Sequence, residues 1–160
     1  MSYRIGFGVD FHQLSAGKDL WIGGVNIPNN KGAVGYSDAD VLLHAICDAL
    51  LGALCLGDIG THFPDSDPAY KNIDSKILLS KTFSLIQGKL FRVVNVDTTV
   101  CLEEPKIKDY TLEMRKEISG ILQVTMEDVS IKATTTEKMG FAGRGEGLVA
   151  YATVLLQLIR

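Results

Sequence analysis

The chain has 160 residues, of which 46% are hydrophobic and 22% are charged, and its formal net charge at pH 7 is -3. The slightly acidic balance excludes a general nucleic-acid-binding surface, and no stretch is long and apolar enough to predict a membrane span. We expect one globular domain over residues 1–160, with its own apolar core and without nucleic-acid or membrane partners.

The cysteines and the amino terminus bear on the cellular compartment. Cys47, Cys55 and Cys101 are odd in number and lack C-x-x-C spacing, which favours reduced thiols over disulfides or a cysteine-based zinc site. Residues 1–4 lead directly into strand-like sequence, so we expect neither a signal peptide nor a transit peptide. Together these features predict a cytoplasmic protein.

The first elements in chain order are strands. Residues 3–10 are typical of a strand, and residues 20–22 and 25–27 flank Gly23-Gly24 in the pattern of a hairpin. Residues 29–32, with two asparagines and a glycine, predict a loop. We therefore expect the amino-terminal part of the chain to supply strands.

A helix is expected next, beginning at Ser37 with Asp40 at capping-box spacing. Its polar residues Asp40, His44 and Asp48 follow i, i+4, i+8 spacing and share one face. Its apolar residues recur at i, i+1, i+4 and i+5, which predicts an amphipathic helix. This apolar stripe consists of Val41, Leu42, Ala45, Ile46, Ala49, Leu50, Ala53 and Leu54.

The middle of the chain predicts a loop, a helix and a strand. Residues 56–67 are loop-like, and a helix is expected from residue 74 or 75 to about residue 87, with Gly88 as its C-cap. Residues 93–102 alternate apolar and polar side chains, which predicts a half-buried strand.

The remaining elements complete the expected fold. Residues 109–122 predict a third helix and residues 129–133 a short strand. Residues 148–159 form a strand that is apolar on both faces, so we expect a subunit interface to cover one face. This order of elements predicts an α+β two-layer sandwich, with helices packed on one face of a mixed four-stranded sheet.

Two histidines and an aspartate form a candidate metal site. Asp10 and His12 are two residues apart on a strand, so their side chains point to the same face. His44 lies off the apolar stripe of its helix and can supply a third ligand, with Asp40 or Asp48 orienting its second ring nitrogen. Three protein ligands with an open fourth position are typical of catalytic zinc. The alternative for His44 is a solvated polar row.

The segment at residues 132–147 combines hydroxyls, charges and glycines between two strands. Thr134, Thr135 and Thr136 offer hydroxyl and backbone donors that suit phosphate oxygens. Glu137 offers an oxygen ligand of the kind that magnesium accepts beside substrate phosphates, and Arg144 can bind an anion in bidentate fashion. The alternative is a glycine-rich turn with a solvated charge cluster.

In these motifs, and in order over nearly its whole length, the chain resembles the 2-C-methyl-D-erythritol 2,4-cyclodiphosphate synthase family. The resemblance implies a homotrimer whose sheets face inward, with active sites between neighbouring subunits. The main motifs are Gly8-Val9-Asp10-Phe11-His12, Ser37-Asp38-Ala39-Asp40-Val41 with His44, Leu56-Gly57-Asp58-Ile59-Gly60, Phe63-Pro64-Asp65, Ala133-Thr134-Thr135-Thr136-Glu137-Lys138 and Gly143-Arg144-Gly145-Glu146-Gly147.

The resemblance also implies a reaction and its cofactors. In that reaction the 2-phosphate of 4-diphosphocytidyl-2-C-methyl-D-erythritol 2-phosphate attacks the β-phosphorus, and CMP leaves as a cyclic diphosphate forms. The implied enzyme is a phosphorus–oxygen lyase of the non-mevalonate route of isoprene and terpenoid biosynthesis. Asp10, His12 and His44 are implied to bind one Zn²⁺ per subunit, and Glu137 is implied to bind Mg²⁺ or Mn²⁺ together with the substrate.

The resemblance further implies which residues contact the substrate. Tyr36 and Thr135 are the implied catalytic positions, and Phe141 and Arg144 are implied to lie near a trimer axis that can hold an isoprenoid diphosphate. The implied substrate-binding residues are Asp10, His12, Tyr36, Ser37, Asp58, Ile59, Gly60, Phe63, Pro64, Asp65, Ser66, Asp67, Pro105, Lys106, Thr134, Thr135, Thr136, Glu137, Phe141 and Arg144.

The chain departs from the family pattern at two places that matter for activity. Tyr36 stands where the family commonly has a histidine that helps to stabilise the transition state. A tyrosine hydroxyl donates a hydrogen bond but carries no positive charge near neutral pH, so we expect activity with an altered rate. Glu103-Glu104 makes the implied cytidine loop more acidic than in relatives.

Two alternative functions remain open at the level of the sequence. A metal-dependent phosphohydrolase or nuclease would share the metals and the phosphate loop but would need a positioned water. A non-catalytic trimeric protein that binds isoprenoid diphosphates would use Phe141 and Arg144 and would tolerate Tyr36.

Overall fold

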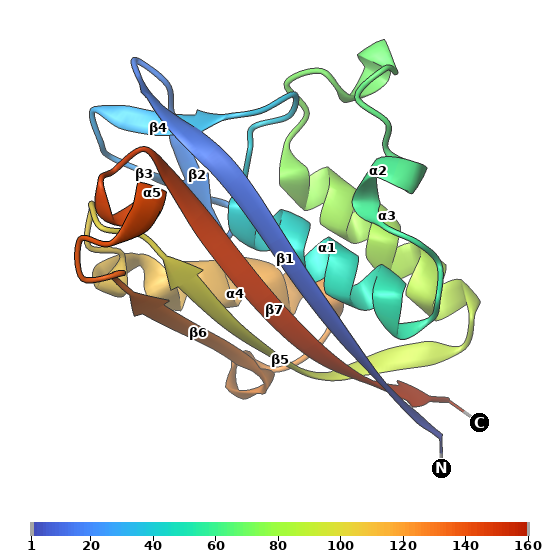
Figure 1. Ribbon diagram of the computed structural model, residues 1–160. Coiled ribbons are helices and arrows are strands. Elements are labelled where there is room, and N and C mark those ends of the chain that lie inside the picture. Colours follow the sequence, from blue (N-terminus) through green and yellow to red (C-terminus); the bar gives the residue numbers. More distant parts are fainter. Residues whose placement is uncertain (1, 160) are drawn as a thin grey trace.

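The computed structural model describes residues 2–159, whose strands form a five-stranded mixed sheet and a separate two-stranded hairpin (Figure 1). The large sheet has the order β4-β1-β7-β5-β6, in which only the β5–β6 pair is parallel. The strands are β1 (Tyr3–Ala16), β2 (Leu20–Ile22), β3 (Val25–Ile27), β4 (Lys31–Val34), β5 (Phe91–Cys101), β6 (Val129–Thr134) and β7 (Gly147–Leu158). The α-helices are α1 (Val41–Ala53), α2 (Ile59–His62), α3 (Ser75–Gly88), α4 (Thr111–Leu122) and α5 (Gly140–Gly143), and the 3₁₀ turns are η1 (Pro68–Tyr70), η2 (Lys108–Tyr110) and η3 (Met126–Asp128).

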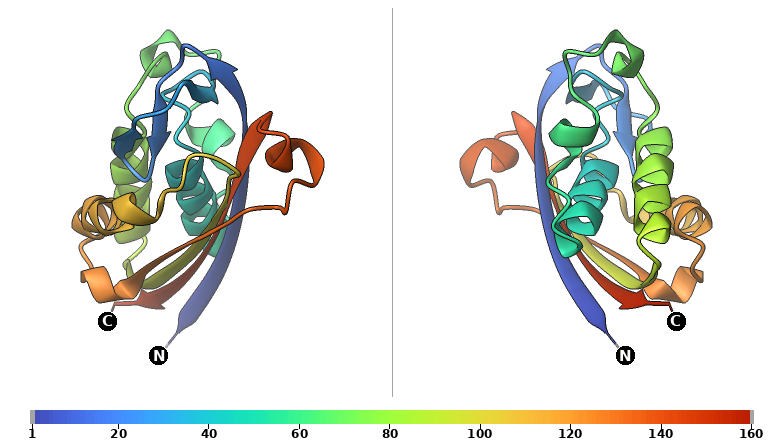
Figure 2. Two further views of the ribbon diagram at one scale, coloured as in Figure 1. Left: turned by 90° about the vertical axis from the view of Figure 1, so that its left-hand side faces the viewer. Right: turned by 90° about the vertical axis from the view of Figure 1, so that its right-hand side faces the viewer.

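Helices α1, α3 and α4 lie on one side of the sheet, and the short α5 stands on the other side (Figure 2). The predicted α+β sandwich with helices on one face of a mixed sheet is therefore confirmed. The predicted number of four strands is wrong, because β1 continues past Asp10 to Ala16 and pairs there with β4. His12 consequently lies within a paired strand. Within residues 2–159, no helix has the length and apolar character that crossing a bilayer requires.

Glycines on β1 let helix α1 approach the sheet closely. Even-numbered positions of β1 face α1, because successive side chains of a strand alternate between faces, and two of these positions are glycines. A Cβ at Gly8 would lie only 2.0 Å from the carbonyl oxygen of Ala45 in α1. Asp10 and His12 follow on the same face, so the close contact directs them toward the first turn of the helix.

Helix α1 begins at Val41, so the prediction that it begins at Ser37 is wrong. The residue that caps it is Asp40, whose fully buried carboxylate accepts hydrogen bonds from two N–H groups of the first helical turn at 3.0 and 3.2 Å. The same carboxylate accepts from the backbone N–H groups of Gly23 and Gly24 at 2.9 and 2.7 Å. One side chain therefore fixes both the start of α1 and the position of the β2–β3 hairpin.

The other predicted elements differ from the observed ones mainly at their ends. Helix α3 begins at Ser75 with Asp74 as its N-cap, and Gly88 is its last residue instead of its C-cap. The expected loop at residues 56–67 contains the one-turn helix α2, and the expected loop at residues 29–32 contains the start of β4. The two missed elements, α2 and β4, have four residues each and are too short to give a periodic signal.

The sheet face opposite α1 is rich in exposed apolar side chains. On β1, Ile5 is 73% exposed, Phe7 62% and Phe11 54%, and Tyr151 of the neighbouring β7 is 39% exposed. The rings of Phe7 and Tyr151 stack with their centroids 6.4 Å apart. A contiguous apolar surface of this kind is a common feature of protein–protein interfaces.

Candidate metal centre and active site

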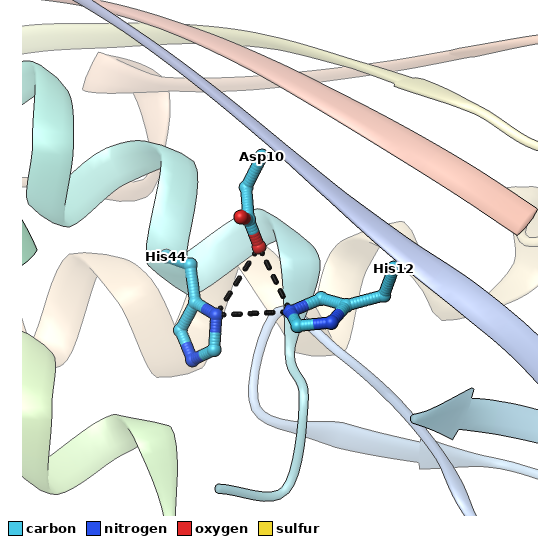
Figure 3. A group of neighbouring side chains, drawn as sticks. All are labelled: Asp10, His12 and His44. Atoms are coloured by element: carbon cyan, nitrogen blue, oxygen red, sulfur yellow. Dashed lines mark hydrogen bonds and ion pairs between the residues drawn. The ribbon is translucent and has the colours of Figure 1, made fainter. Parts of the chain in front are cut away.

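Asp10 and His12 from β1 and His44 from α1 bring three metal-ligating atoms together (Figure 3). The Oδ2 atom of Asp10 lies 2.9 Å from Nε2 of His12 and 3.2 Å from Nδ1 of His44, and these two ring nitrogens are 3.2 Å apart. Ligands around a tetrahedral zinc with ordinary bond lengths are about 3.4 Å apart. The three atoms therefore fit one small tetrahedral cation and leave its fourth position to an outside ligand.

The charge of Asp10 suits a cation, whereas a proton on His12 would have to leave when a metal binds. Burial acts to raise the pKa of Asp10, but the hydrogen bonds and charges of His12 and His44 outweigh it and lower the pKa to about 2. For His12, burial acts to lower the pKa, and the hydrogen bond and charge of Asp10 outweigh it and raise the pKa. Asp10 is therefore ionised near neutral pH, as a metal ligand must be.

Each histidine ring has a partner at its second nitrogen. The Nδ1–H group of His12 donates to the carbonyl oxygen of Val34 at 2.9 Å, which leaves Nε2 free to bind a cation. In His44 the roles of the nitrogens are reversed. Its Nδ1 atom faces Asp10 and His12, which together with His44 form the triad, and its Nε2 atom lies 2.8 Å from Oγ of Ser75 and 3.2 Å from Oγ of Ser37. The prediction that Asp40 or Asp48 orients this nitrogen is wrong, because serines occupy that place.

Asp48 instead holds the segment that follows α1. Its Oδ1 atom accepts a hydrogen bond of 2.7 Å from the backbone N–H group of Ile59, the first residue of α2. Asp58 caps the same short helix through Thr61, whose N–H and hydroxyl groups both donate to its carboxylate, at 2.8 and 2.7 Å. Two aspartates thus fix the position of Ile59 and Gly60 beside the triad.

A cavity of about 320 Å³ opens next to the triad. Many of the predicted substrate-binding residues line it together with His44, namely His12, Tyr36, Ser37, Ile59, Gly60, Phe63, Pro64 and Asp65. The sequence interpretation missed three further lining residues, Tyr70, Ile73 and Leu78. These three belong to no motif: Tyr70 and Ile73 lie between the predicted loop and the predicted second helix, and Leu78 lies within that helix.

Tyr36 lines this cavity and is hydrogen-bonded to Asp67 and Asn72, which follow it in the chain. Its hydroxyl donates to the carbonyl oxygen of Asp67 at 3.2 Å, and its own carbonyl accepts from the N–H group of Asn72 at 2.8 Å. Asp67 in turn caps the 3₁₀ turn η1 through the N–H group of Ala69, while the neighbouring Ser66 is exposed. The hydroxyl of Tyr36 is therefore engaged by the segment at residues 63–67.

The remaining predicted residues form a separate group at the other end of the sheet order. Thr134 ends β6, which lies three strands from β1, about 14 Å at ordinary strand spacing. Thr135 and Glu137 meet in the turn that follows, where the threonine hydroxyl donates to the Glu137 carboxylate at 3.3 Å and Thr136 donates to a backbone carbonyl. Pro105 follows a cis peptide bond, and Lys106 is exposed.

Within residues 2–159 of one chain, this second group does not join the cluster of Asp10, His12 and His44. Phe141 and Arg144 belong to neither group. The ring of Phe141 in α5 lies 6.2 Å from that of Phe11 on the exposed sheet face, and Arg144 forms an ion pair of 2.8 Å with Glu146. A single chain therefore presents two separate sets of predicted substrate residues.

Comparisons with known proteins agree with the resemblance. A model described as the YgbB family matches residues 3–157. A 2-C-methyl-D-erythritol 2,4-cyclodiphosphate synthase from Bacteroides thetaiotaomicron is 56% identical over 157 residues, which are 98% of this chain and 99% of the relative. A synthase of the same name from Porphyromonas gingivalis is 54% identical over 154 residues, 96% of this chain and 95% of the relative.

Solved structures have the same fold. The structure titled "IspF (Plasmodium falciparum) CDP complex" has a TM-score of 0.88 at 35% identity, with 99% of this chain and 98% of that chain covered. The bifunctional IspDF from Campylobacter jejuni has a TM-score of 0.95 at 37% identity over 99% of this chain, which spans 43% of that longer protein. Because the family model covers nearly the whole chain and relatives are more than half identical to it, the chain belongs to the YgbB family, as do these cyclodiphosphate synthases.

Proposed function

We propose that this chain converts 4-diphosphocytidyl-2-C-methyl-D-erythritol 2-phosphate to 2-C-methyl-D-erythritol 2,4-cyclodiphosphate and CMP. It would act as a cytoplasmic phosphorus–oxygen lyase of non-mevalonate isoprenoid biosynthesis, formed by one domain over residues 1–160. The observation that carries the proposal is the cluster of Asp10, His12 and His44, two of which line a cavity together with predicted substrate residues. The names of the relatives support the same assignment.

The residues of the chain suit two divalent cations. Asp10, His12 and His44 would hold Zn²⁺, and Glu137, with Thr135 beside it, would hold Mg²⁺ or Mn²⁺ together with the substrate phosphates. When bound, these cations neutralise phosphate charge and polarise the phosphoryl group under attack.

The protein itself contributes binding and orientation. The attacking phosphate is already ionised near neutral pH, so no strong general base is needed. Ring closure is opposed by entropy, which residues that hold both ends of the substrate overcome. Residues 58–60 and 63–67 would hold the methylerythritol end, Pro105 and Lys106 the cytidine end, and Thr134, Thr135 and Thr136 the phosphates between them. The hydroxyls of these threonines donate within their own turn, so they would have to redirect to the substrate to stabilise the charge that moves to the leaving CMP.

A homotrimer would bring the two sets of substrate residues together. The exposed apolar face of β1 and β7 would become the subunit interface, and the triad of one subunit would face the threonine turn of its neighbour. An isoprenoid diphosphate would bind near the trimer axis, as the resemblance implies, with Phe141, which lies beside Phe11, close to it. Arg144 would have to exchange its ion pair with Glu146 for the diphosphate.

Tyr36 provides the first prediction. Because its hydroxyl donates to the Asp67 carbonyl, Tyr36→Phe should loosen the segment at residues 63–67 and raise KM several-fold, with a smaller change in kcat. Tyr36→His should raise kcat, since an imidazole can carry positive charge toward the reacting phosphate. Steady-state kinetics of wild type and both variants measure this. An inactive wild type rescued only by histidine would contradict the expectation that tyrosine supports catalysis.

The proposed function is tested by following phosphorus NMR of the purified protein with the phosphorylated diphosphocytidyl substrate, zinc and magnesium. Stoichiometric CMP and a cyclic diphosphate are expected, and Asp10→Ala, which removes a triad ligand, should abolish both. Free phosphate or a linear product would indicate a phosphohydrolase instead. Intact substrate together with tight binding of an isoprenoid diphosphate would indicate a binding protein without synthase activity.

A further inference from the structure

The two ring nitrogens of His44 face different surroundings: Nδ1 faces the Asp10 carboxylate at 3.2 Å, which a bound cation would occupy, and Nε2 faces two serine hydroxyls. In Figure 3 the Nδ1 atom faces Asp10 and His12, and the Nε2 atom points away from them. A neutral imidazole has one N–H donor and one nitrogen lone pair. His44 can therefore bind a cation through Nδ1 only if its proton is on Nε2.

Two serine hydroxyls lie within reach of Nε2, and they differ in what they can do. Ser75 is fully buried at the first position of α3, and its Oγ is 2.8 Å from Nε2. Its single hydroxyl proton is already donated to Oδ1 of Asp38, so toward Nε2 it presents only a lone pair. Ser37 is farther from Nε2, at 3.2 Å, and its hydroxyl remains free to donate or to accept.

Asp38 is held so that it can only accept. Its Oδ2 atom accepts from the backbone N–H group of Ser75 at 2.9 Å, and its Oδ1 atom accepts from the N–H group of Asp40 at 3.1 Å as well as from the Ser75 hydroxyl. In each of these hydrogen bonds the Asp38 carboxylate is the acceptor. The Ser75 hydroxyl therefore donates to Asp38, and Ser75 Oγ can only accept from Nε2 of His44.

The geometry points to Asp38 and Ser75 as positioning residues that keep the proton of His44 on Nε2 and its Nδ1 lone pair directed at the metal. The inference rests on the zinc site of the proposed function. His12 achieves the opposite arrangement with a backbone carbonyl, that of Val34. His44 lies on α1, and the acceptor for its Nε2–H group is the side chain of Ser75 on α3. This chain of hydrogen bonds from His44 through Ser75 to Asp38, here called the relay, therefore also links α1 to α3.

The test measures zinc affinity by competition with a chelator, using the purified full chain and Ser75→Ala, Asp38→Asn and Ser37→Ala variants. Loss of a partner behind a metal-bound histidine typically lowers metal affinity about 10- to 100-fold. We expect losses in that range for Ser75→Ala and Asp38→Asn, and a loss below about 2-fold for Ser37→Ala. Ser84→Ala, at an exposed position of the same helix, controls for unspecific effects on α3.

A second readout follows the proton directly. Nitrogen-15 NMR of the zinc-loaded protein should show the Nε2–H group of His44 hydrogen-bonded in wild type and in Ser37→Ala. In Ser75→Ala, the Nε2–H group loses its acceptor, so its signal should shift toward that of an imidazole N–H without this hydrogen bond. A change in overall stability alone would not move this signal.

The outcomes separate the relay from the proposed function. A wild-type protein that binds no zinc would overturn the metal site itself. A wild type that binds zinc, with Ser75→Ala binding it equally tightly and with an unchanged Nε2–H signal, would overturn the relay alone. A larger loss for Ser37→Ala than for Ser75→Ala would also overturn it, because Ser37 would then orient the ring. If Asp38→Asn does not fold, the comparison of the two serine variants still decides.

Discussion

Two aspartates show how the surroundings of a residue determine the effect of its charge. Asp48 is half-buried, and burial raises the pKa of its carboxyl above the ordinary value. Asp97 on β5 accepts a hydrogen bond of 2.7 Å from Nζ of Lys132, which lowers the pKa of Asp97. The folded state therefore holds a proton longer at Asp48 and releases one earlier at Asp97 than the unfolded chain does.

Opposite pH dependences are expected when each of these charges is removed. The contribution of Asp48 to stability is present at acidic pH and is lost as the pH rises through its raised pKa, so Asp48→Asn should gain stability relative to wild type toward neutral pH. The contribution of Asp97 is present above its ordinary pKa and is lost as the pH falls, so Asp97→Asn should be less stable at neutral pH and converge on wild type in acid. Urea unfolding at several pH values measures both effects. If the free energy of unfolding changed with pH in the same way in both variants, the opposite pKa shifts of Asp48 and Asp97 would be contradicted.

At the scale of elements, the buried cap of α1 holds a helix and a hairpin together. Asp40→Ala would leave buried N–H groups of Gly23 and Gly24 and of the first helical turn without an acceptor. Each such group costs about 1–3 kcal/mol, so we expect a loss of at least ~3 kcal/mol in the free energy of unfolding. Asp74→Ala removes an exposed cap of α3 and should cost only about 1 kcal/mol. Thermal and urea unfolding of both variants compare the losses, and similar values would refute this role.

The close contact between β1 and α1 gives a second prediction at this scale. A Cβ at Gly8 would meet the Ala45 carbonyl oxygen at 2.0 Å, so Gly8→Ala should displace α1 and cost about 1–3 kcal/mol. Because α1 carries His44, zinc affinity should fall as well. Gly120→Ala is the control: its Cβ would meet open space in α4, and the change should stabilise the protein by about 0.5–1 kcal/mol. Unchanged zinc affinity in a folded Gly8→Ala variant would contradict the link between packing and site.

At the scale of the whole molecule, the exposed apolar face of β1 and β7 is the surface on which a trimer would form. Phe7 is 62% exposed there and stacks on Tyr151, while Leu85 is 39% exposed on α3 in the helix layer. A charge introduced at a buried interface is costly because it loses its water. Charged substitutions at the two positions should therefore affect assembly differently.

Phe7→Asp should convert a trimer to monomers and abolish synthase activity. Each site would then lose the turn at residues 134–137 that the neighbouring subunit would supply. Leu85→Asp should remain trimeric. Sedimentation velocity gives the mass of both variants and of the wild type. A wild type that sediments as a monomer and still makes the cyclic diphosphate would contradict the trimer.

Much of the fold and of the site could be predicted from local patterns. The helical stripe of α1, the hairpin around Gly23-Gly24 and the alternation along β5 are periodic signals that neighbouring residues carry by themselves. Asp10 and His12 could be placed on one face for the same reason, since strand geometry alone sets their direction. The order of these elements was sufficient for the α+β class with helices on one face of the sheet.

By itself the sequence determined the long helices and strands and marked Asp10, His12 and His44 as candidate metal ligands, because periodicity and motif spacing are local properties. Only the tertiary structure decided that β1 extends to Ala16 with β4 as a fifth strand, that Asp40 caps α1, and that Ser75 stands behind His44. Ser75 and His44 are 31 residues apart, and no local pattern encodes such a contact. It arises because close packing of α1 on β1 and of α3 on α1 leaves each buried polar atom few partners to choose from.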